Sequence, residues 1–436
     1  MTPPSHKTVL ILASKLGYQT RGFAEAAERL RVEVRFGTDR CHKLDDPWGD
    51  DALALHFENP REAAQEIART LGGVAASGKA INAVIALGDR PTVTAAYAAE
   101  ALRIAGNPPA AVEICRSKLR QRETLRAAGV RVPDFFSFAG ESDLAGVLRQ
   151  VKFPCVVKPL SLSASQGVIR ANNREEFAEA VRRIRLLMES PEIQVLREPE
   201  RDRLLVEGYV PGREVAVEGL IEGGRLRVLA IFDKPDPLEG PYFEEAIYVT
   251  PSRLPAEMQK AIEECARNAV RALGLTTGPV HAEFRVTESG PWVLEIAPRP
   301  IGGLCARALR FGADKISLEE LLLRDALGMP GGDAEREAAA SGVMMIPVPQ
   351  SGIFDGVDGI EAAASVAGVT EIEMTTRLRD YVAAWPEGSS YLGFIFARGD
   401  SAPDVERALR AAHERMNFRF SERLPVQHPA TGKIAS

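Results

Sequence analysis

The sequence predicts a protein that joins an α/β layer to α+β regions. Residues 8–105 alternate between strand and helix patterns, as parallel α/β layers do. Residues 134–335 instead mix short strands and hairpins with a few helices. From about residue 340 the pattern changes again, to strands followed by an amphipathic helix. We therefore expect a parallel sheet near the N-terminus and mixed layers after it.

These changes of pattern divide the chain into three expected domains. A length of 436 residues suits two or three domains. We expect an N-terminal α/β domain over residues 1–112, a central domain over 113–335 and a C-terminal α+β subdomain over 336–436. A smaller subdomain is expected within the central one, at about 134–206.

Composition and charge argue against several classes of partner. The net charge of −6 disfavours nucleic acid or an anionic membrane as a partner. The apolar run Val9–Ala13 is too short for a signal peptide or a membrane span. The five cysteines are scattered and form no C-x-x-C pair, which favours reduced thiols and a cytoplasmic location.

The N-terminal layer is predicted from its apolar periodicity. Strands are expected over 8–14, 32–37, 51–57 and 81–89, and helices over 20–30, about 60–77 and 91–106. The layer lacks the G-x-G-x-x-G fingerprint, so we do not interpret it as a nicotinamide or flavin domain. The ends of its strands can still line a cleft for a small ligand. One helix carrying Lys118 follows, between a proline-marked junction and an exit at 129–133.

A small-residue loop follows the apolar strand that ends in Lys158 and Pro159. The loop and the residue at which a strand resumes are Ser161, Ser163, Ala164, Ser165, Gly167 and Val168. Small residues let backbone N–H groups approach phosphate oxygens, and a lysine adds a point charge for them. Taken alone, the motif fits a polar hairpin turn with a surface lysine better than it fits a phosphate site.

Two glutamates in the next segment flank an extended Tyr-Val-Pro-Gly linker, with Glu207 before it and Glu214 after it. An extended linker with free backbone groups can bind an adenine edge. Glu207 could then accept from the exocyclic amine, and Glu214 from ribose hydroxyls. A hairpin around residues 222–224 follows and ends at Lys234. No single residue here favours a nucleotide-binding site over an ordinary hairpin with solvent-facing acids.

The hairpin over 280–298 carries a pair of acids. A three-residue loop ending in Gly290 is expected, which places Thr287 opposite Pro291 and Glu283 opposite Glu295. One face would then be apolar and face the core, with Ala282, Phe284, Val286, Trp292, Leu294 and Ile296. The other face collects His281, Glu283, Arg285 and Glu295.

Two carboxylates that face each other across a β-ladder destabilise it unless a cation lies between them. Proteins usually bind Mg²⁺ through one or two carboxylates together with the phosphates of a substrate. Glu283 and Glu295 are therefore candidate ligands of a Mg²⁺ ion that holds a nucleotide polyphosphate. A solvated outer face with Arg285 as the counter-ion is an equally good interpretation of this hairpin alone.

The order of these features resembles the ATP-grasp superfamily of carboxylate–amine and carboxylate–thiol ligases. A lysine on a helix comes first, followed by a strand that ends in a lysine and a loop of small residues. Two glutamates seven residues apart come next, then a second strand that ends in a lysine. The last motif is two glutamates twelve residues apart, with an arginine four residues after the second. The segments FDKPDPLEGPYFEEAIYVTPSRLP and EIAPRPIGGLCARAL look especially like the L-amino acid (dipeptide) ligase branch. The likeness covers nearly the whole chain. It implies an ATP-grasp fold with a Rossmann-like N-terminal domain and a small lid subdomain.

The resemblance implies which residues bind the nucleotide and the metal. The nucleotide would be bound by Lys118, Lys158, Ser163, Ser165, Gly167, Val168, Glu207, Tyr209, Val210 and Glu214. Among these, the two lysines would contact the phosphates, residues 207–210 the adenine and Glu214 the ribose. Glu283 and Glu295 would bind Mg²⁺.

The same resemblance implies catalytic and substrate-binding residues. Arg299 would stabilise the acyl phosphate and the tetrahedral oxyanion, and Lys234 would lie near the γ-phosphate. Glu245 would hold a substrate ammonium, and Gly302 and Gly303 would line the substrate pocket together with Arg299.

The cofactors implied are ATP and Mg²⁺, with two metal ions and with Mn²⁺ as an alternative ion. Many relatives carry Asn two residues after the second glutamate as a further metal ligand, where this chain has Ala297. The partners implied are small molecules, namely an amino acid or another carboxylate together with an amine. The family also suggests a homodimer.

The function implied is the ATP-dependent joining of a carboxylate to an amine through an acyl phosphate, with release of ADP and phosphate. A thiol ligase or a purine-pathway-type ligase would use the same ATP chemistry with another acceptor. A non-catalytic sensor would bind ATP without turnover. A Rossmann-type dehydrogenase is disfavoured because the glycine fingerprint is missing.

Overall fold

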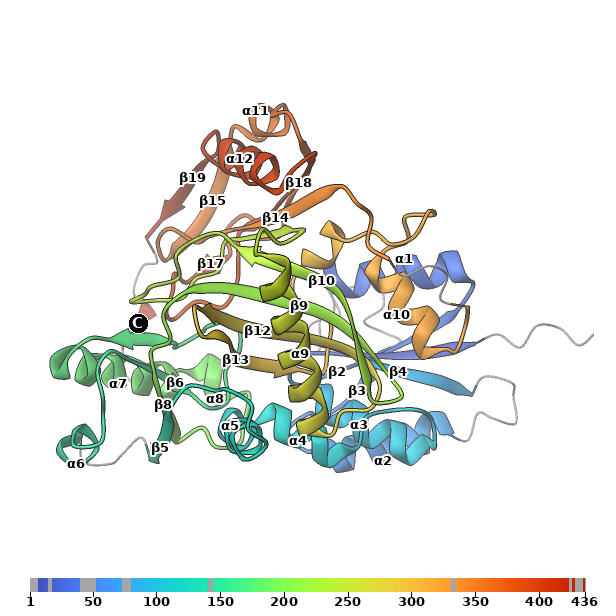
Figure 1. Cartoon of the computed structure of the whole chain (residues 1–436), viewed down its shortest axis with the longest axis horizontal. Helices are drawn as coiled ribbons and strands as arrows, with labels where there is room; N and C mark the ends of the chain where they lie inside the picture. Colours follow the sequence, from blue (N-terminus) through green and yellow to red (C-terminus); the bar gives the residue numbers. More distant parts are fainter. Residues whose placement is uncertain are drawn as a thin grey trace, which may run out of the picture.

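Over the residues that it describes, a computed structural model of the chain arranges the strands in five sheets, with helices packed on them (Figure 1). It describes residues 7–14, 18–39, 52–72, 80–139, 144–330, 335–422, 426–427 and 434–435. The smallest sheet is a ribbon of two short strands near the C-terminus, Val426–Gln427 (β20) and Ile434–Ala435 (β21). The expected combination of α/β and α+β layers is confirmed.

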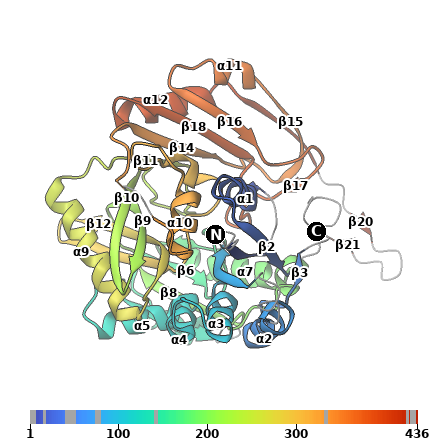
Figure 2. The ribbon, with the colours of Figure 1, turned by 90° about the vertical axis from the view of Figure 1, so that its right-hand side faces the viewer.

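The N-terminal sheet is parallel, as expected, and has the order β3-β2-β1-β4. Its strands are Thr8–Ala13 (β1), Glu33–Thr38 (β2), Leu53–Ala54 (β3) and Ile81–Leu87 (β4). Helices cover both of its faces, namely Tyr18–Leu30 (α1), Pro60–Leu71 (α2), Thr92–Leu102 (α3) and Leu318–Ala326 (α10) (Figure 2). Strand β1 is buried along its whole length because a parallel sheet is covered on two sides.

Four elements near the N-terminus differ from their expected extents, among them the helix expected over 91–106, which ends with α3 at Leu102. The strand expected over 51–57 is reduced to β3, and the helix expected over 60–77 ends with α2, beyond which 73–79 lie outside the described residues. The single helix expected around Lys118 is two helices, Pro109–Arg116 (α4) and Lys118–Ala127 (α5). Ser117 is extended between them, and its Oγ accepts from Arg120 N at 3.4 Å to cap α5.

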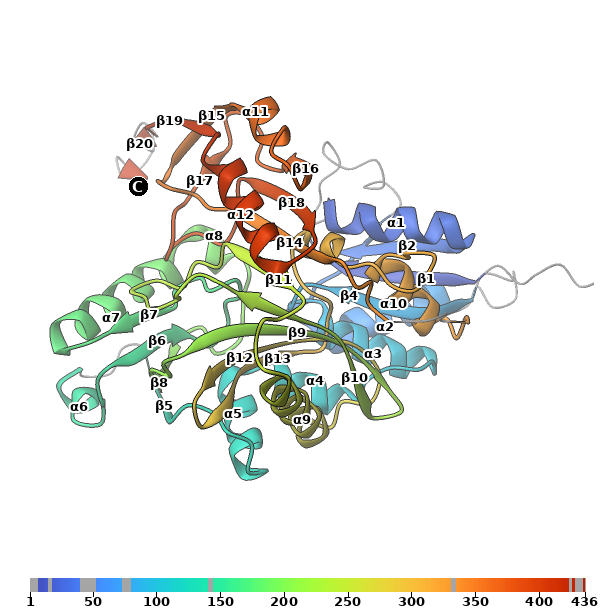
Figure 3. The ribbon, with the colours of Figure 1, turned by 45° about the horizontal axis from the view of Figure 1, so that its top comes forward.

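The small subdomain is built on a four-stranded antiparallel sheet of order β5-β8-β6-β7 (Figure 3). Its elements are Phe135–Ala139 (β5), Leu144–Leu148 (α6), Cys155–Pro159 (β6), Ile169–Ala171 (β7), Arg174–Glu189 (α7), Pro191–Gln194 (α8) and Arg203–Gly208 (β8). Helix α7 packs its apolar stripe, including Phe177, Val181 and Ile184, against this sheet. The loop 161–168 joins β6 to β7.

The largest sheet has eight strands in the order β13-β12-β9-β10-β11-β14-β18-β16. Its strands are Arg213–Glu222 (β9), Arg225–Lys234 (β10), Ile247–Thr250 (β11), Gly278–Thr287 (β12), Gly290–Ala297 (β13), Ala340–Ile346 (β14), Val369–Met374 (β16) and Gly393–Gly399 (β18). Helix α9, Ala256–Leu273, covers one face, and a short 3₁₀ helix, η2, spans Cys305–Ala308. The hairpins expected around residues 223 and 289 are both present.

The C-terminal region adds a layer beside this sheet. Its further elements are Gly352–Asp358 (β15), Ile360–Ala364 (α11), Tyr381–Val382 (β17), Ala402–His413 (α12) and Asn417–Ser421 (β19). The apolar face expected for α12 consists of Val405, Leu409, Ala412 and Met416; the first three are fully buried, whereas Met416 lies beyond the end of this helix. Among the helices of the described ranges, none is both long enough and apolar enough to cross a membrane.

We predict that Phe284→Ala destabilises the protein strongly. The Phe284 ring is fully buried in the core between β12 and the surrounding helices, and its removal leaves a cavity that costs about 3–5 kcal/mol. Urea denaturation measures the loss. Glu288→Ala, in the exposed loop of the same hairpin, should change the free energy of unfolding by no more than about 0.5 kcal/mol. Equal effects of the two substitutions would contradict this placement of the core.

Candidate active site

A cavity of about 380 Å³ lies where the parallel sheet, the small subdomain, the eight-stranded sheet and the C-terminal region meet. Most of the expected site residues line it: Lys118, Lys158, Ser163, Ser165, Val168, Glu207, Tyr209, Val210, Glu214, Glu245, Glu283, Glu295, Arg299, Gly302 and Gly303. Lys234 instead lies buried against three of the lining carboxylates. Gly167 lies in the cavity loop but donates its N–H to Pro386 O at 2.8 Å.

The hairpin of β12 and β13 brings the two expected acids together, but with a different loop. Thr287 pairs with Gly290, not with Pro291, so the loop has two residues. A bulge next to Glu283 then shifts the register by one residue, and Glu283 faces Glu295. The expected pairing of the acids is confirmed, and the expected three-residue loop is wrong, because the ladder already closes at Thr287 and Gly290.

The shorter loop also changes which residues face the core. Val293 pairs with Phe284 and is fully buried with it, whereas Trp292 and Leu294 are only partly buried. The expected apolar face was therefore wrong for Trp292, which lies opposite Arg285, and for Leu294. As the bulged residue, Leu294 lines the cavity, so the site has an apolar wall beside its acids.

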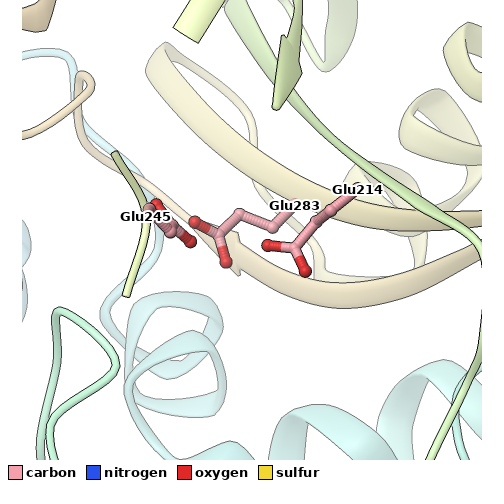
Figure 4. Close-up of side chains that lie close together, drawn as sticks. All are labelled: Glu214, Glu245 and Glu283. Atoms are coloured by element: carbon pink, nitrogen blue, oxygen red, sulfur yellow. The ribbon is translucent and has the colours of Figure 1, made fainter. Parts of the chain in front are cut away.

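The carboxylates of Glu214, Glu245 and Glu283 lie close together (Figure 4), and all three contact Lys234. Its Nζ lies 2.8 Å from Glu214, 2.5 Å from Glu245 and 3.2 Å from Glu283. The carboxylate oxygens lie within 4.8 Å of one another, and Arg285 and His281 also contact Glu214 and Glu283, respectively. Because such oxygens are preferred ligands of Mg²⁺, this acid cluster fits a divalent cation. It contains Glu283 of the expected pair, but Glu214 and Glu245 in place of Glu295.

Burial and crowding shift the pKa values in this cluster. Burial, together with the charge of Glu283, raises the pKa of Glu245 to about 7 against the effect of Lys234. Burial alone would lower the pKa of Lys234, but the three carboxylates outweigh it and raise that pKa. Burial would also raise the pKa of Glu283, yet Lys234 and His281 hold it below its usual range. Glu245 is therefore the member of the cluster that takes up a proton near neutral pH.

Glu207 joins two buried cations. Its Oε2 lies 2.6 Å from Lys158 Nζ, and its Oε1 accepts from Arg122 Nε at 2.6 Å. Burial opposes the charged carboxylate, but Arg122 and Lys158 lower its pKa to about 2. Both oxygens of Glu207 thus hold cations in place, a positioning role that the sequence did not indicate.

Arg299 is held by an acid from the N-terminal sheet. Asp89 follows β4, and its Oδ1 lies 2.7 Å from Arg299 Nε while its Oδ2 accepts from Nη2 at 3.2 Å. Burial opposes the ionisation of Asp89, but Arg299 lowers its pKa to about 2. Gly88 and Asp89 both line the cavity, so the end of a parallel strand contributes to the site, as expected. The guanidinium is oriented before any ligand binds.

His281 is sandwiched between two acids. Its Nδ1 contacts Glu218, and its Nε2 lies 3.4 Å from Glu283 Oε1. Burial disfavours the charged imidazole, but Glu218 raises its pKa to about 9. The other oxygen of Glu218 accepts from Ile301 N at 3.1 Å, and Gln19 Nε2 donates to Ile301 O at 3.1 Å. These bonds fix the segment that leads into Gly302 and Gly303.

Gly303 could not carry a side chain in this position. Its φ of 61° is left-handed, and a Cβ would lie 2.9 Å from the ring of Phe394. The glycine thus lets the segment after Arg299 approach the C-terminal region closely.

The loop 161–168 has a strained backbone. Ala164 and Ser165 both have left-handed φ values, 53° and 55°, as does Gly167 with 71°. Non-glycine residues adopt this conformation at a cost, and such positions cluster at ligand-binding loops. Lys118 Nζ donates to Leu162 O in the same loop, which brings both expected phosphate-binding lysines to its base.

The linker after β8 is held by stacking. The guanidinium of Arg170 lies 4.0 Å from the centre of the Tyr209 ring, and that of Arg285 lies 5.7 Å from it. Tyr209 N also donates to Pro154 O at 3.1 Å. Tyr209 and Val210 therefore present a fixed edge to the cavity.

Four functional residues were missed at the sequence level: Asp89, Arg122, Glu218 and Tyr248. Asp89 had a usable signal, because it directly follows an apolar strand of a parallel layer. Arg122 had none, since it lies in a highly polar helix and is buried only by tertiary contacts. The Tyr248 hydroxyl donates to Glu245. The sequence does not indicate this contact, because it depends on the path of the irregular segment 236–246.

The chain resembles known proteins both in sequence and in fold. The model of the ATP-grasp domain family matches residues 151–308, and that of L-amino acid ligase C-terminal domain 2 matches residues 344–421. The solved structure of an L-amino acid ligase from Bacillus licheniformis superimposes with a TM-score of 0.80 at 28% identity, over 96% of this chain and 100% of that one.

Two curated relatives extend the comparison. Alanine–anticapsin ligase of Bacillus subtilis is 26% identical over 65% of this chain, which spans 62% of that ligase. D-alanine–D-alanine ligase of Gloeobacter violaceus is 30% identical over 50% of this chain and 70% of the relative.

We predict that the contribution of His281 to stability falls as pH rises. The folded pKa of about 9 exceeds the unfolded value near 6.5. The stabilisation by the imidazolium is therefore complete below about pH 6.5 and is lost as pH rises through 9. The difference in unfolding free energy between wild type and His281→Asn, measured by urea denaturation, should shrink by something on the order of 3 kcal/mol across that range. A difference that grows with pH would contradict the contact with Glu218.

We also predict that Arg122→Met is strongly destabilising. The substitution leaves Glu207 buried with one cation fewer, and breaking a buried ion pair costs roughly 3–5 kcal/mol. Arg120→Met on the same helix, where the side chain is 48% exposed, is the matched control and should have little effect. Urea denaturation of both variants measures the contrast, and equal stability of the two would rule out the buried contact.

Proposed function

This chain belongs to the ATP-grasp superfamily of carboxylate–amine ligases, and from that premise we propose that it joins an amino acid to an amine. In this proposal ATP phosphorylates the carboxylate of the amino acid, and the amine then displaces phosphate from the acyl phosphate. The products are an amide or dipeptide, ADP and phosphate.

The observation that carries the proposal is the sorting of charge within one cavity. Lys118 and Lys158 lie at the base of the loop 161–168, where they would bind phosphate oxygens. The acid cluster around Lys234 faces the same cavity. Phosphoryl transfer depends mainly on positioning and on neutralising charge, and the presence of these cations and acids around one cavity supports the proposal.

Arg299 has the central role in the proposed chemistry. Its contact with Asp89 fixes the guanidinium before substrates bind, so no reorganisation is needed when an oxyanion forms. In the proposal Arg299 first neutralises the acyl phosphate and then the tetrahedral oxyanion created by the amine. Lys234 supports the γ-phosphoryl group from behind the acid cluster.

Mg²⁺ belongs to this proposal as the ion that would be held by Glu283 and Glu295. When bound, it would neutralise the polyphosphate and polarise the transferred phosphoryl group. A second ion is proposed from the family resemblance, and Mn²⁺, which also prefers oxygen ligands, is proposed as an alternative.

Residues that line the cavity near Glu245 support an α-amino acid as the first substrate. Glu245 is the acid proposed to receive the ammonium group, and it lies in the cavity beside Tyr248, Met345 and Phe394. These apolar and aromatic walls favour an amino acid with an apolar side chain. The names of the L-amino acid ligase and of alanine–anticapsin ligase describe amino-acid substrates, which supports the same class.

The proposed location is the cytoplasm, and the proposed oligomeric state is a homodimer. Cys115, Cys155, Cys265 and Cys305 are free thiols, which supports a reducing compartment such as the cytoplasm. A homodimer is proposed from the family resemblance and is tested by light scattering of the purified protein.

The decisive experiment is a panel of amino acids offered in pairs with ATP and Mg²⁺. Phosphate release identifies active pairs, and mass spectrometry identifies the nucleotide and the amide. We expect ADP and a dipeptide from at least one pair. AMP and pyrophosphate as products would contradict the acyl-phosphate route, and a thiol that accelerates ADP release more than any amine would favour a thioester ligase.

We predict that Glu295→Gln lowers turnover by at least roughly 10²-fold, because a charge needed at the transferring phosphoryl group is removed. The fold should stay intact, since Glu295 is only half-buried and the amide has the same shape. Glu288→Gln in the exposed loop of the hairpin is the control. Retained activity in Glu295→Gln, measured by ADP release, would count against the metal assignment.

A further inference from the structure

A short segment of the C-terminal region is hydrogen-bonded to the loop 161–168. We call residues 384–391 the docking segment. Within it, Pro386 O accepts from Gly167 N at 2.8 Å and Glu387 O accepts from Gln166 Nε2 at 2.7 Å. Trp385 Nε1 donates to Ala164 O at 3.3 Å. Three successive residues of the docking segment thus form hydrogen bonds with the proposed phosphate loop.

An ion pair adds a fourth contact to the same subdomain. Arg183 on helix α7 binds both oxygens of Glu387, with Nη2 at 2.7 Å and 2.8 Å. The bidentate geometry fixes direction as well as distance. Because Glu387 is 42% exposed, this pair contributes more to orientation than to stability.

The opposite end of the docking segment lines the cavity. Ser389, Ser390 and Tyr391 all face it, and the Tyr391 ring packs on Trp385 with ring centres 5.0 Å apart. Between the two ends, Gly388 makes a tight turn in which a Cβ would lie 2.1 Å from Ala383 O. One stretch of chain therefore touches the phosphate loop at one end and the proposed substrate space at the other.

The loop itself needs such external support. Ala164 and Ser165 are held in left-handed conformations, which non-glycine residues leave unless surrounding contacts maintain them. The bond to Ala164 O is made at one of these residues, and the bond to Gly167 N is made two residues after Ser165. Loss of the docking segment would free the loop at its strained positions.

We propose that Trp385 and Glu387 are positioning residues that couple occupancy of the substrate space to the order of the phosphate loop. A substrate against residues 389–391 stabilises the docking segment, and the docking segment holds the loop over the nucleotide. The consequence is chemical: an acyl phosphate is hydrolysed if water reaches it, so an ordered loop keeps ATP consumption tied to amide formation. This inference rests on the proposed ligase activity.

The test compares phosphate released with amide formed in a substrate pair that the wild type uses. Trp385→Phe keeps the ring packing but removes the donor to Ala164 O, and Glu387→Gln removes the charge that binds Arg183. Each should raise the ratio of phosphate to amide by roughly fivefold, the factor equivalent to about 1 kcal/mol of lost hydrogen bonding. Glu179→Gln is the matched control, because it removes the Arg182–Glu179 pair of α7, which faces solvent.

Hydrogen exchange of the peptide spanning 161–168 provides a readout that needs no turnover. Both variants should exchange faster there than the wild type, and the control should not. The proposal is overturned if the ratio and the exchange are unchanged in both variants, or if the control changes as much as they do. A wild type that forms no amide with any pair would instead refute the proposed function, and the exchange rates would still decide whether the docking segment orders the loop.

Discussion

The site depends on the mutual neutralisation of charges that a buried sheet face cannot otherwise hold. Lys234, Glu214 and Arg285 are cross-strand neighbours on β10, β9 and β12, and the two ion pairs between them are both 2.8 Å long. An isolated charge at this depth would be costly, whereas a paired one is tolerated. The register of three strands is therefore tied to the site, because a slip of one residue would turn every charge into the apolar core.

Ion pairs of the same kind join the layers that surround this sheet. Asp89 of the parallel layer holds Arg299, and Glu207 of the small subdomain holds Arg122 of α5. Each pair takes one partner from each of two layers, so the cations reach their positions only when the layers have assembled. The docking segment adds a third connection, from the C-terminal region to the loop 161–168. Preorganisation of the site is thus a property of the assembled layers and not of any one motif.

The hairpin of β12 and β13 illustrates how far sequence reasoning reaches. Alternation along the strands indicated that Glu283 and Glu295 share a face, and they do. The loop length was wrong, and a bulge restored the pairing. A bulge inserts one residue without leaving a mark on the pattern of apolar residues, so Leu294 was assigned to the core although it lines the cavity. The break between α4 and α5 also leaves no mark on the pattern of apolar residues, since only Ser117 separates the two helices.

The sequence by itself determined the fold class, the order of strands, lysines and acids along the chain, and through that order the family. These properties follow from local periodicity and spacing, which a linear sequence records directly. Only the tertiary structure decided which charges meet. The pairing of Arg122 with Glu207 and of Asp89 with Arg299 joins residues from separate layers. The pairing of Lys234 with three acids joins segments that are far apart along the chain. No local pattern encodes such partners, because they are selected by the burial that the assembled layers create.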